Sequence, residues 1–209
     1  RVLIWNSIPT SHQQPADLVL GQPDMNSSSH NNGGVHSRSL VSPYGIYSDG
    51  IRLMVADSGN HRVLIWNSIP TTNQQPADLV LGQLFWSSSV KNLGGVSSKS
   101  LASPKGIFSD GIRFMVSDCG NSRVLIWNSI PTTNMQAADL VLGQPDMYSH
   151  SRNNGGVSAQ SLSTPWDLHY DGTRLFVSDT RNDRVLIWNS IPTIDQQPAD
   201  FVLGQPNMT

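Results

Sequence analysis

Residues 62–71 read RVLIWNSIPT, and the same phrase begins again at Arg1, Arg123 and Arg184. Successive copies are 61 residues apart each time. A fixed period of this size indicates that one supersecondary unit is copied along the chain, so the unit must be interpreted before any site. A residue found in every copy is first of all a packing element. The functional candidates are therefore the positions at which the copies differ.

One unit, taken at its second copy, predicts four short strands separated by Gly, Asn, Asp and Pro, and shows no useful helical period. The first two turns have hairpin length, which predicts an antiparallel meander. In the third strand Val63, Leu64 and Ile65 are consecutive apolar residues. Alternation fails there, so both faces of the strand should be covered. The expected strands span 45–48, 52–56, 62–67 and 77–82.

A four-stranded meander covered on both faces and repeated along the chain is a β-propeller blade, which packs face to face with its neighbours. We therefore predict an all-β propeller made of four-stranded antiparallel blades. The expected organisation is a half blade at 1–22, made of third and fourth strands, then three blades with their preceding loops at 23–83, 84–144 and 145–209. This is about 3.5 blades, whereas closed propellers have about 4 to 8. We expect a ring of about 6–7 blades, completed by a longer parent chain or by self-association.

A loop of about 20 residues follows each fourth strand, which is long for a compact domain. It carries the chain from the outer edge of one blade to the inner strand of the next. Val35 and Leu40 recur at the matching positions of the later loops, and we expect both to pin the loop onto the ring. The later members are Val96, Leu101, Val157 and Leu162.

The residues 43–46 (PYGI) and 55–63 (VADSGNHRV) resemble the repeat of NHL-repeat β-propellers, and the second segment recurs at 116–124 and 177–185. The resemblance covers nearly the whole chain, although the period is longer than the family unit because of the loop after the fourth strand. The chain is also similar to a group of prokaryotic, exported repeat proteins with RVLIWNSIPT and ADLVLGQP phrases. The resemblance implies a propeller architecture and an exported location. It leaves function open, because the family includes binding platforms and a few enzymes.

Each unit carries an Asp before its second tight turn and an Arg after it. We interpret the Asp as an acceptor for its own turn, and the Arg as a donor to carbonyls or to the carboxylate of a neighbouring blade. The alternative is a ring of metal ligands, which would not need one Arg per Asp. The residues are Asp57, Arg62, Asp118, Arg123, Asp179 and Arg184.

A Trp ends each apolar third strand. We interpret it as filling the space between adjacent blades, and the alternative is an indole face that stacks on a sugar. The copies are Trp5, Trp66, Trp127 and Trp188.

The inner strands differ most between the copies, and their side chains should face the central channel. Tyr44, Lys105 and Trp166 stand at one equivalent position, so we expect them at the channel mouth as ligand contacts. Asp167 and His169 replace a Gly and an aromatic residue, and alternation places them on one face of the strand. They could point into the channel, where a metal or an acid–base pair is conceivable, or into the blade packing.

One long loop carries the aromatic pair Phe85 and Trp86 where the other copies have Asp and Met. An exposed aromatic pair of this kind is a candidate interface. The alternative is that both side chains tuck beneath their own loop.

The composition argues against some partners. The net charge is −2 and charged residues are 13%, so nucleic acid and anionic membranes are poor partners. No apolar run approaches the roughly 20 residues of a membrane helix. The single cysteine, Cys119, excludes an internal disulfide.

The sequence shows no nucleophile–base constellation, phosphate loop or metal motif. We therefore expect no cofactor, no metal and no enzymatic activity. The expected function is a rigid binding or scaffold module whose loops and channel mouth contact another protein or a repetitive surface. One alternative is a lectin-like propeller with a sugar pocket in each blade. The other is a metal-dependent lyase or hydrolase with its site in the channel.

Overall fold

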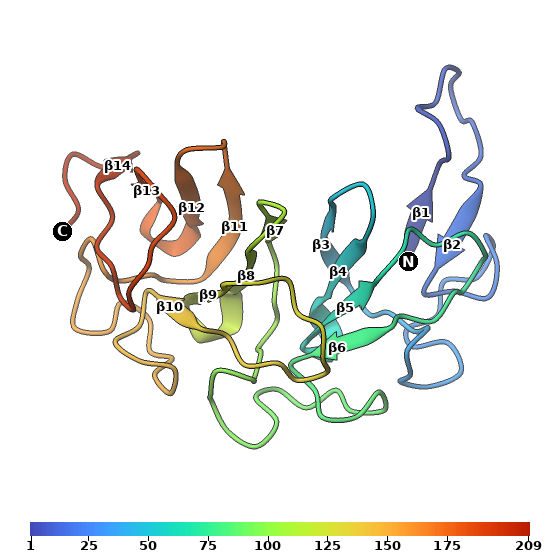
Figure 1. The fold of residues 1–209 in the computed structure, drawn as a ribbon, viewed down its shortest axis with the longest axis horizontal. Coiled ribbons are helices and arrows are strands. Elements are labelled where there is room, and N and C mark those ends of the chain that lie inside the picture. Colours follow the sequence, from blue (N-terminus) through green and yellow to red (C-terminus); the bar gives the residue numbers. More distant parts are fainter.

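The computed structural model describes residues 1–209, and its only helices are three 3₁₀ turns, η1 to η3. The strands form three four-stranded sheets and one two-stranded hairpin (Figure 1). The N-terminal hairpin is β1 (Val2–Ile4) and β2 (Leu18–Leu20). The first sheet is β3 (Pro43–Ser48), β4 (Leu53–Asp57), β5 (Arg62–Trp66) and β6 (Leu79–Leu81). The second sheet is β7 (Ile107–Ser109), β8 (Phe114–Asp118), β9 (Arg123–Trp127) and β10 (Leu140–Leu142). The third sheet is β11 (Pro165–Tyr170), β12 (Leu175–Asp179), β13 (Arg184–Trp188) and β14 (Phe201–Leu203).

Each sheet is an antiparallel meander in which every strand pairs with the next one in the chain. The hairpin β1–β2 has the register of β5–β6, with Val2 opposite Leu20 as Val63 is opposite Leu81. The all-β prediction is therefore confirmed. The hairpin and the three sheets follow one another along an open arc in chain order, with the termini at its two ends (Figure 1).

Apolar side chains fill each junction between neighbouring sheets. Leu81 and Ile65 of the first sheet pack in one cluster with Trp127 and Leu125 of the second. Equivalent clusters join the hairpin to the first sheet and the second sheet to the third. Every residue of β5 and β9 is buried, as the lack of alternation predicts for strands covered on both faces. Trp66, Trp127 and Trp188 therefore fill the junctions, which supports their interpretation as packing elements between sheets.

The Asp–Arg pairs are buried inside each unit. The Arg123 Nε lies 2.8 Å from Asp118 Oδ2, and both side chains have no exposed surface. The guanidinium also donates to the carbonyls of Ser97 and Ser100 in the preceding loop and of Met147 in the following one. Of the two kinds of partner that the sequence leaves open for the Arg, the structure shows the backbone carbonyls, and the carboxylate that it binds belongs to its own sheet. The Asp118 carboxylate accepts from Ala102 N–H of the preceding loop and from the Asn121 side-chain amide of its own turn, but from no backbone N–H of that turn. Each pair thus fastens two long loops to one sheet, and the other pairs do the same.

The expectation for the loops is half right. Leu40, Leu101 and Leu162 are buried, so this position does pin the loop. Val157 is 41% exposed and its equivalents are only half-buried, so the valines do not. They follow a pair of glycines with positive φ, which turns this part of the loop outward.

A second connection reaches backward onto the preceding sheet. The Asn73 side chain accepts a hydrogen bond from Val19 N–H at 2.9 Å, and Gln74 N–H donates to the Val19 carbonyl. The contact therefore covers the outer edge of β2. The same contact recurs when Asn134 and Met135 bind Val80, and when Asp195 and Gln196 bind Val141.

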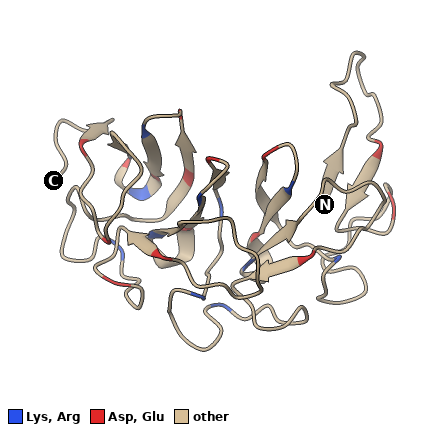
Figure 2. Ribbon diagram, in the orientation of Figure 1, with Lys and Arg blue, Asp and Glu red and all other residues tan.

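Charged residues are spread along the arc and do not gather on one face (Figure 2). None of the three helical turns, each three residues long, could cross a bilayer.

Candidate functional site

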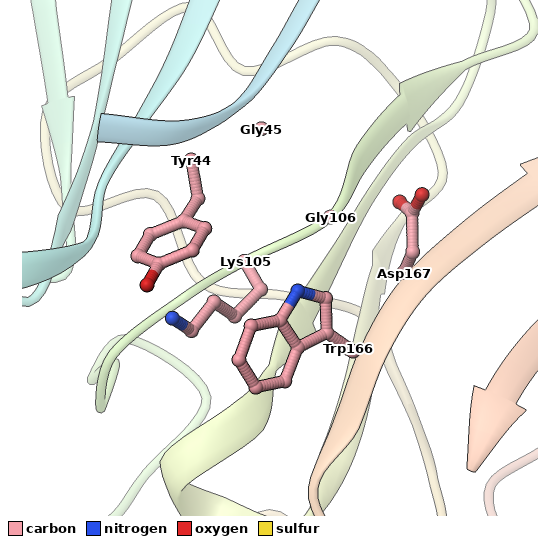
Figure 3. Close-up of a pocket in the computed structure, with 6 residues that line it drawn as sticks. All are labelled: Tyr44, Gly45, Lys105, Gly106, Trp166 and Asp167. Carbon is pink, nitrogen blue, oxygen red and sulfur yellow. The ribbon is translucent and has the colours of Figure 1, made fainter. Parts of the chain in front are cut away.

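The side chains of Tyr44, Lys105 and Trp166 converge from three sheets at one end of the inner strands (Figure 3). The Lys105 Nζ lies 3.1 Å from the centroid of the Tyr44 ring and 4.3 Å from that of Trp166. The two rings meet edge to face at 5.8 Å. An ammonium between two aromatic faces is stabilised by their quadrupoles. The structure thus brings together the three variable residues that the sequence places at one equivalent position, in what we call the mouth cluster.

Two glycines let the inner strands approach closely enough for this. A Cβ on Gly45 would lie 2.1 Å from the Lys105 carbonyl oxygen, and one on Gly106 would lie 2.8 Å from Asp167 Cα. Gly106 N–H also donates to the Trp166 carbonyl at 3.0 Å. The backbones of neighbouring sheets therefore touch at these positions, and the side chain just before each glycine is held at the mouth.

The pocket at the mouth cluster is small. Its volume is about 120 Å³, and its lining includes both glycines and Asp167. Pockets for drug-sized ligands have about 300–1,000 Å³, so this one admits a single side chain or sugar substituent. Tyr44 is 49% exposed and Trp166 is 43% exposed, which leaves an apolar rim around the pocket. The Lys105 ammonium takes part in no salt bridge or side-chain hydrogen bond within the chain, so its N–H groups are available to a ligand.

Asp167 borders the mouth pocket, and with His169 it also lines a second surface. Alternation along β11 separates both side chains from that of Trp166, and the strand is irregular between Pro165 and Leu168. The Asp167 carboxylate points away from the Lys105 ammonium (Figure 3). Together with His169 it lines a hollow of about 190 Å³ on the uncovered face of the third sheet. Of the two directions left open by the sequence, the structure therefore favours the face used for packing between sheets. The ring centroids of His169 and of Phe108 in the second sheet lie 5.5 Å apart.

The sequence interpretation missed a larger hollow at the opposite end of the inner strands. It has a volume of about 510 Å³ and is lined by Tyr47, Phe108 and Tyr170 and by three Asp-Gly turns. Each turn aspartate is already used locally. Asp49, for example, accepts from two backbone N–H groups of its turn and from the Arg52 side chain. The available signal was an aromatic residue one or two positions before each Asp-Gly phrase.

The loop pair divides into one exposed and one packed residue. Phe85 is 62% exposed and stays a candidate interface residue. Trp86 is half-buried against the core of the first junction, and its carbonyl accepts from the Arg62 guanidinium. Phe85 therefore fits the interpretation as an exposed interface residue, whereas Trp86 does not.

No group of three His, Cys, Asp or Glu side chains lies close enough together to hold a metal ion. Cys119 is buried, and burial raises the pKa of its thiol. Burial also lowers the pKa of His61, whose Nδ1 accepts a hydrogen bond from Ser103 N–H at 3.0 Å. The imidazole thus has a structural role at a turn, and the site with open chemistry is the mouth cluster.

No protein-family model matches the sequence, and a comparison with curated proteins finds no match either.

Proposed function

We propose that the chain is an arc of an NHL-type β-propeller and acts as a non-enzymatic binding module through its mouth cluster. Stacked four-stranded meanders with their first strands innermost support the propeller proposal, which implies a ring of about 6–7 blades. The observation that carries the binding proposal is the convergence of Tyr44, Lys105 and Trp166 at one small pocket. These positions vary among otherwise similar copies, and only variable positions can distinguish one ligand from another.

The preferred ligand is a protein segment that presents a carboxylate beside an apolar side chain. The Lys105 ammonium would take the carboxylate, and charge-assisted hydrogen bonds of this kind are stronger than neutral ones. Tyr44 and Trp166 would cover the neighbouring apolar group. Tyr and Trp are enriched where binding energy concentrates in protein interfaces.

A sugar is the second candidate, because two exposed aromatic faces flank the pocket. An acidic sugar would use the same ammonium. The structure offers no donor cluster that favours the metal-dependent alternative.

The test is a binding screen with two probe sets, peptides with a fixed Glu and their Gln counterparts, and an array of neutral and acidic oligosaccharides. We expect Glu peptides to bind, and binding to be lost in Lys105→Met and in Trp166→Ala with unchanged melting temperatures. Tyr148→Ala is the matched control, because Tyr148 is an exposed aromatic residue (73%) away from the mouth. Binding of acidic sugars alone would favour the second candidate. Binding that survives both mouth substitutions would refute the proposal.

A further inference from the structure

The hollow at the end of the inner strands opposite the mouth cluster has a volume of about 510 Å³. This volume lies within the range of about 300–1,000 Å³ that small-molecule pockets have. The nine lining residues come from the ends of β3, β7 and β11 and from the Asp-Gly turns that follow these strands. Figure 1 shows the three turns on the same side of the arc. No residue of the N-terminal hairpin or of β13 and β14 takes part, so three consecutive sheets build the hollow.

Three aromatic rings form the walls of the hollow. Phe108 stands in the middle, and its ring centroid lies 5.0 Å from that of Tyr47 and 6.3 Å from that of Tyr170. The rings are inclined to Phe108 at 52° and 66°, as the walls of a cage are, and do not form a stack. The Tyr47 hydroxyl donates to the Ser109 carbonyl, and the Tyr170 hydroxyl donates to the Gly172 carbonyl at 2.9 Å. These hydrogen bonds hold both outer rings in place.

The third ring comes from a position at which the copies differ. Tyr170 stands directly before its Asp-Gly phrase, where the first two sheets have Ser48 and Ser109. Neighbouring residues of a strand point to opposite faces. Tyr47, one repeat position earlier, reaches forward to Phe108 of the following sheet, whereas Tyr170 reaches back to Phe108 of the preceding sheet. The change from serine to tyrosine therefore adds a wall that the other repeats do not supply.

The polar side chains of the hollow are already bound within the chain. Each turn aspartate uses one carboxylate oxygen for two backbone N–H groups of its turn and the other oxygen for the Arg three positions further on. The Ser109 hydroxyl donates to the Arg113 carbonyl and accepts from Gly111 N–H. The hollow therefore offers a ligand aromatic faces but no unused hydroxyl group.

The charged groups that line the hollow are negative. The aspartates of all three turns belong to the lining, and their arginine partners do not. Burial, and next Asp49 and Asp110, raise the pKa of the Tyr47 hydroxyl, in agreement with a negative potential at this ring. Ring faces beside negative charge attract a cation. A cation without N–H groups suits this lining best, because it requires no hydrogen-bond acceptor.

From the rings, the charge and the occupied polar groups we infer that this hollow binds the trimethylammonium group of a small organic cation. Phe108 would lie behind the trimethylammonium group, and Tyr47 and Tyr170 would flank it, in the manner of an aromatic cage. The inference uses none of the mouth residues and stands or falls apart from the proposed binding function.

The first test is titration calorimetry with choline and with its neutral carbon isostere, in which a tert-butyl group replaces the trimethylammonium group. The two probes have the same shape, and only choline is attracted by the rings and the aspartates. We expect choline to bind about tenfold more tightly than the isostere. Equal affinities, or no saturable binding of either probe, would refute the inference. A peptide with a trimethylated lysine that binds more tightly than choline would overturn the assignment to a small molecule.

Substitutions then locate the site. Tyr170→Ser copies the first two sheets at this position and should weaken choline binding by about tenfold, with the protein folded by circular dichroism. Tyr148→Ser is the matched control, because it makes the same replacement at an exposed tyrosine that does not line the hollow. Choline binding that survives Tyr170→Ser would overturn the inference. Loss of choline binding in Trp166→Ala would place the ligand at the mouth and would overturn it as well.

A charge variant keeps the inference testable if the loss of the Tyr170 ring disturbs the packing. Asp49→Asn keeps the side-chain oxygen that accepts from its turn and removes the negative charge. It should weaken choline binding by about two- to fivefold and leave the affinity for the isostere unchanged. Equal effects on the two probes would show that the aspartate acts through the shape of its turn, and the assignment of a cation to this hollow would be wrong.

Discussion

Trp127→Ala and Trp5→Ala remove the same side chain from the same repeat position, once inside a junction and once at an end of the arc. Both indoles donate a hydrogen bond at 3.1 Å, to the carbonyls of Gln136 and Gln14 respectively. The free-energy cost of losing this hydrogen bond is therefore the same in the two variants and cancels when they are compared. What differs is the covering of the indole: the preceding sheet and β8 of its own sheet leave Trp127 only 1% exposed, and Trp5 has neither.

Truncation of a buried Trp costs about 3–5 kcal/mol, because contacts are lost and a cavity is left. Trp127 also packs against Phe114, with ring centroids 5.5 Å apart. At Trp5 more than a third of the surface is already in water and no closed cavity can form, so we expect a cost of about 1–2 kcal/mol. The predicted difference of about 2–3 kcal/mol is the joint contribution of the preceding sheet and of β8 at this position.

The assay is urea unfolding followed by circular dichroism, with both variants measured at the same low protein concentration. The free energies of unfolding are compared only if the two m-values agree. Equal costs would show that neither the preceding sheet nor β8 adds to stability through the Trp. The assignment of the tryptophans to packing between sheets would then be wrong.

Three further predictions concern other repeat positions. Gly106→Ala should destabilise the protein by about 1–3 kcal/mol, because its Cβ would lie 2.5 Å from Asp167 Oδ1. Asp167→Ala should cost less than about 1 kcal/mol in the same urea assay, and equal effects would contradict the close approach of the two strands at Gly106. Arg123→Met should cost about 3–5 kcal/mol, because it leaves the Asp118 carboxylate buried without its partner. Arg52→Met removes one member of a partly exposed ion pair and should cost at most about 1 kcal/mol. Equal shifts of the melting temperature in the two variants would count against a stabilising role of the buried pair. Burial, and next Lys91, lower the pKa of His61, so the folded protein binds this proton less readily than the unfolded chain. The free energy of unfolding should therefore fall as the pH drops below 6.5 toward the lower pKa of the folded protein. His61→Ser, which copies Ser122, should remove this pH dependence when unfolding is measured at a series of pH values.

The strands could be predicted from the sequence because their signals are local. Consecutive apolar residues in RVLIW indicate a strand covered on both faces, and β5 and β9 are buried throughout. The convergence of Tyr44, Lys105 and Trp166 could be predicted as well, because the first strands of successive sheets lie innermost and equivalent positions then meet. Their role as ligand contacts stays a prediction.

Other features depend on contacts between distant residues and left no local signal. The Arg123 guanidinium pairs with Asp118 directly opposite it on β8, but its bonds to the carbonyls of Ser97, Ser100 and Met147 join residues 23 to 26 positions away. Alternation does place Trp166 and Asp167 on opposite faces, but it gives no sign of the register shift between Pro165 and Leu168, which recurs between Pro43 and Ile46. The contact of Asn73 with Val19 spans 54 residues, and its Asn is otherwise an ordinary loop residue.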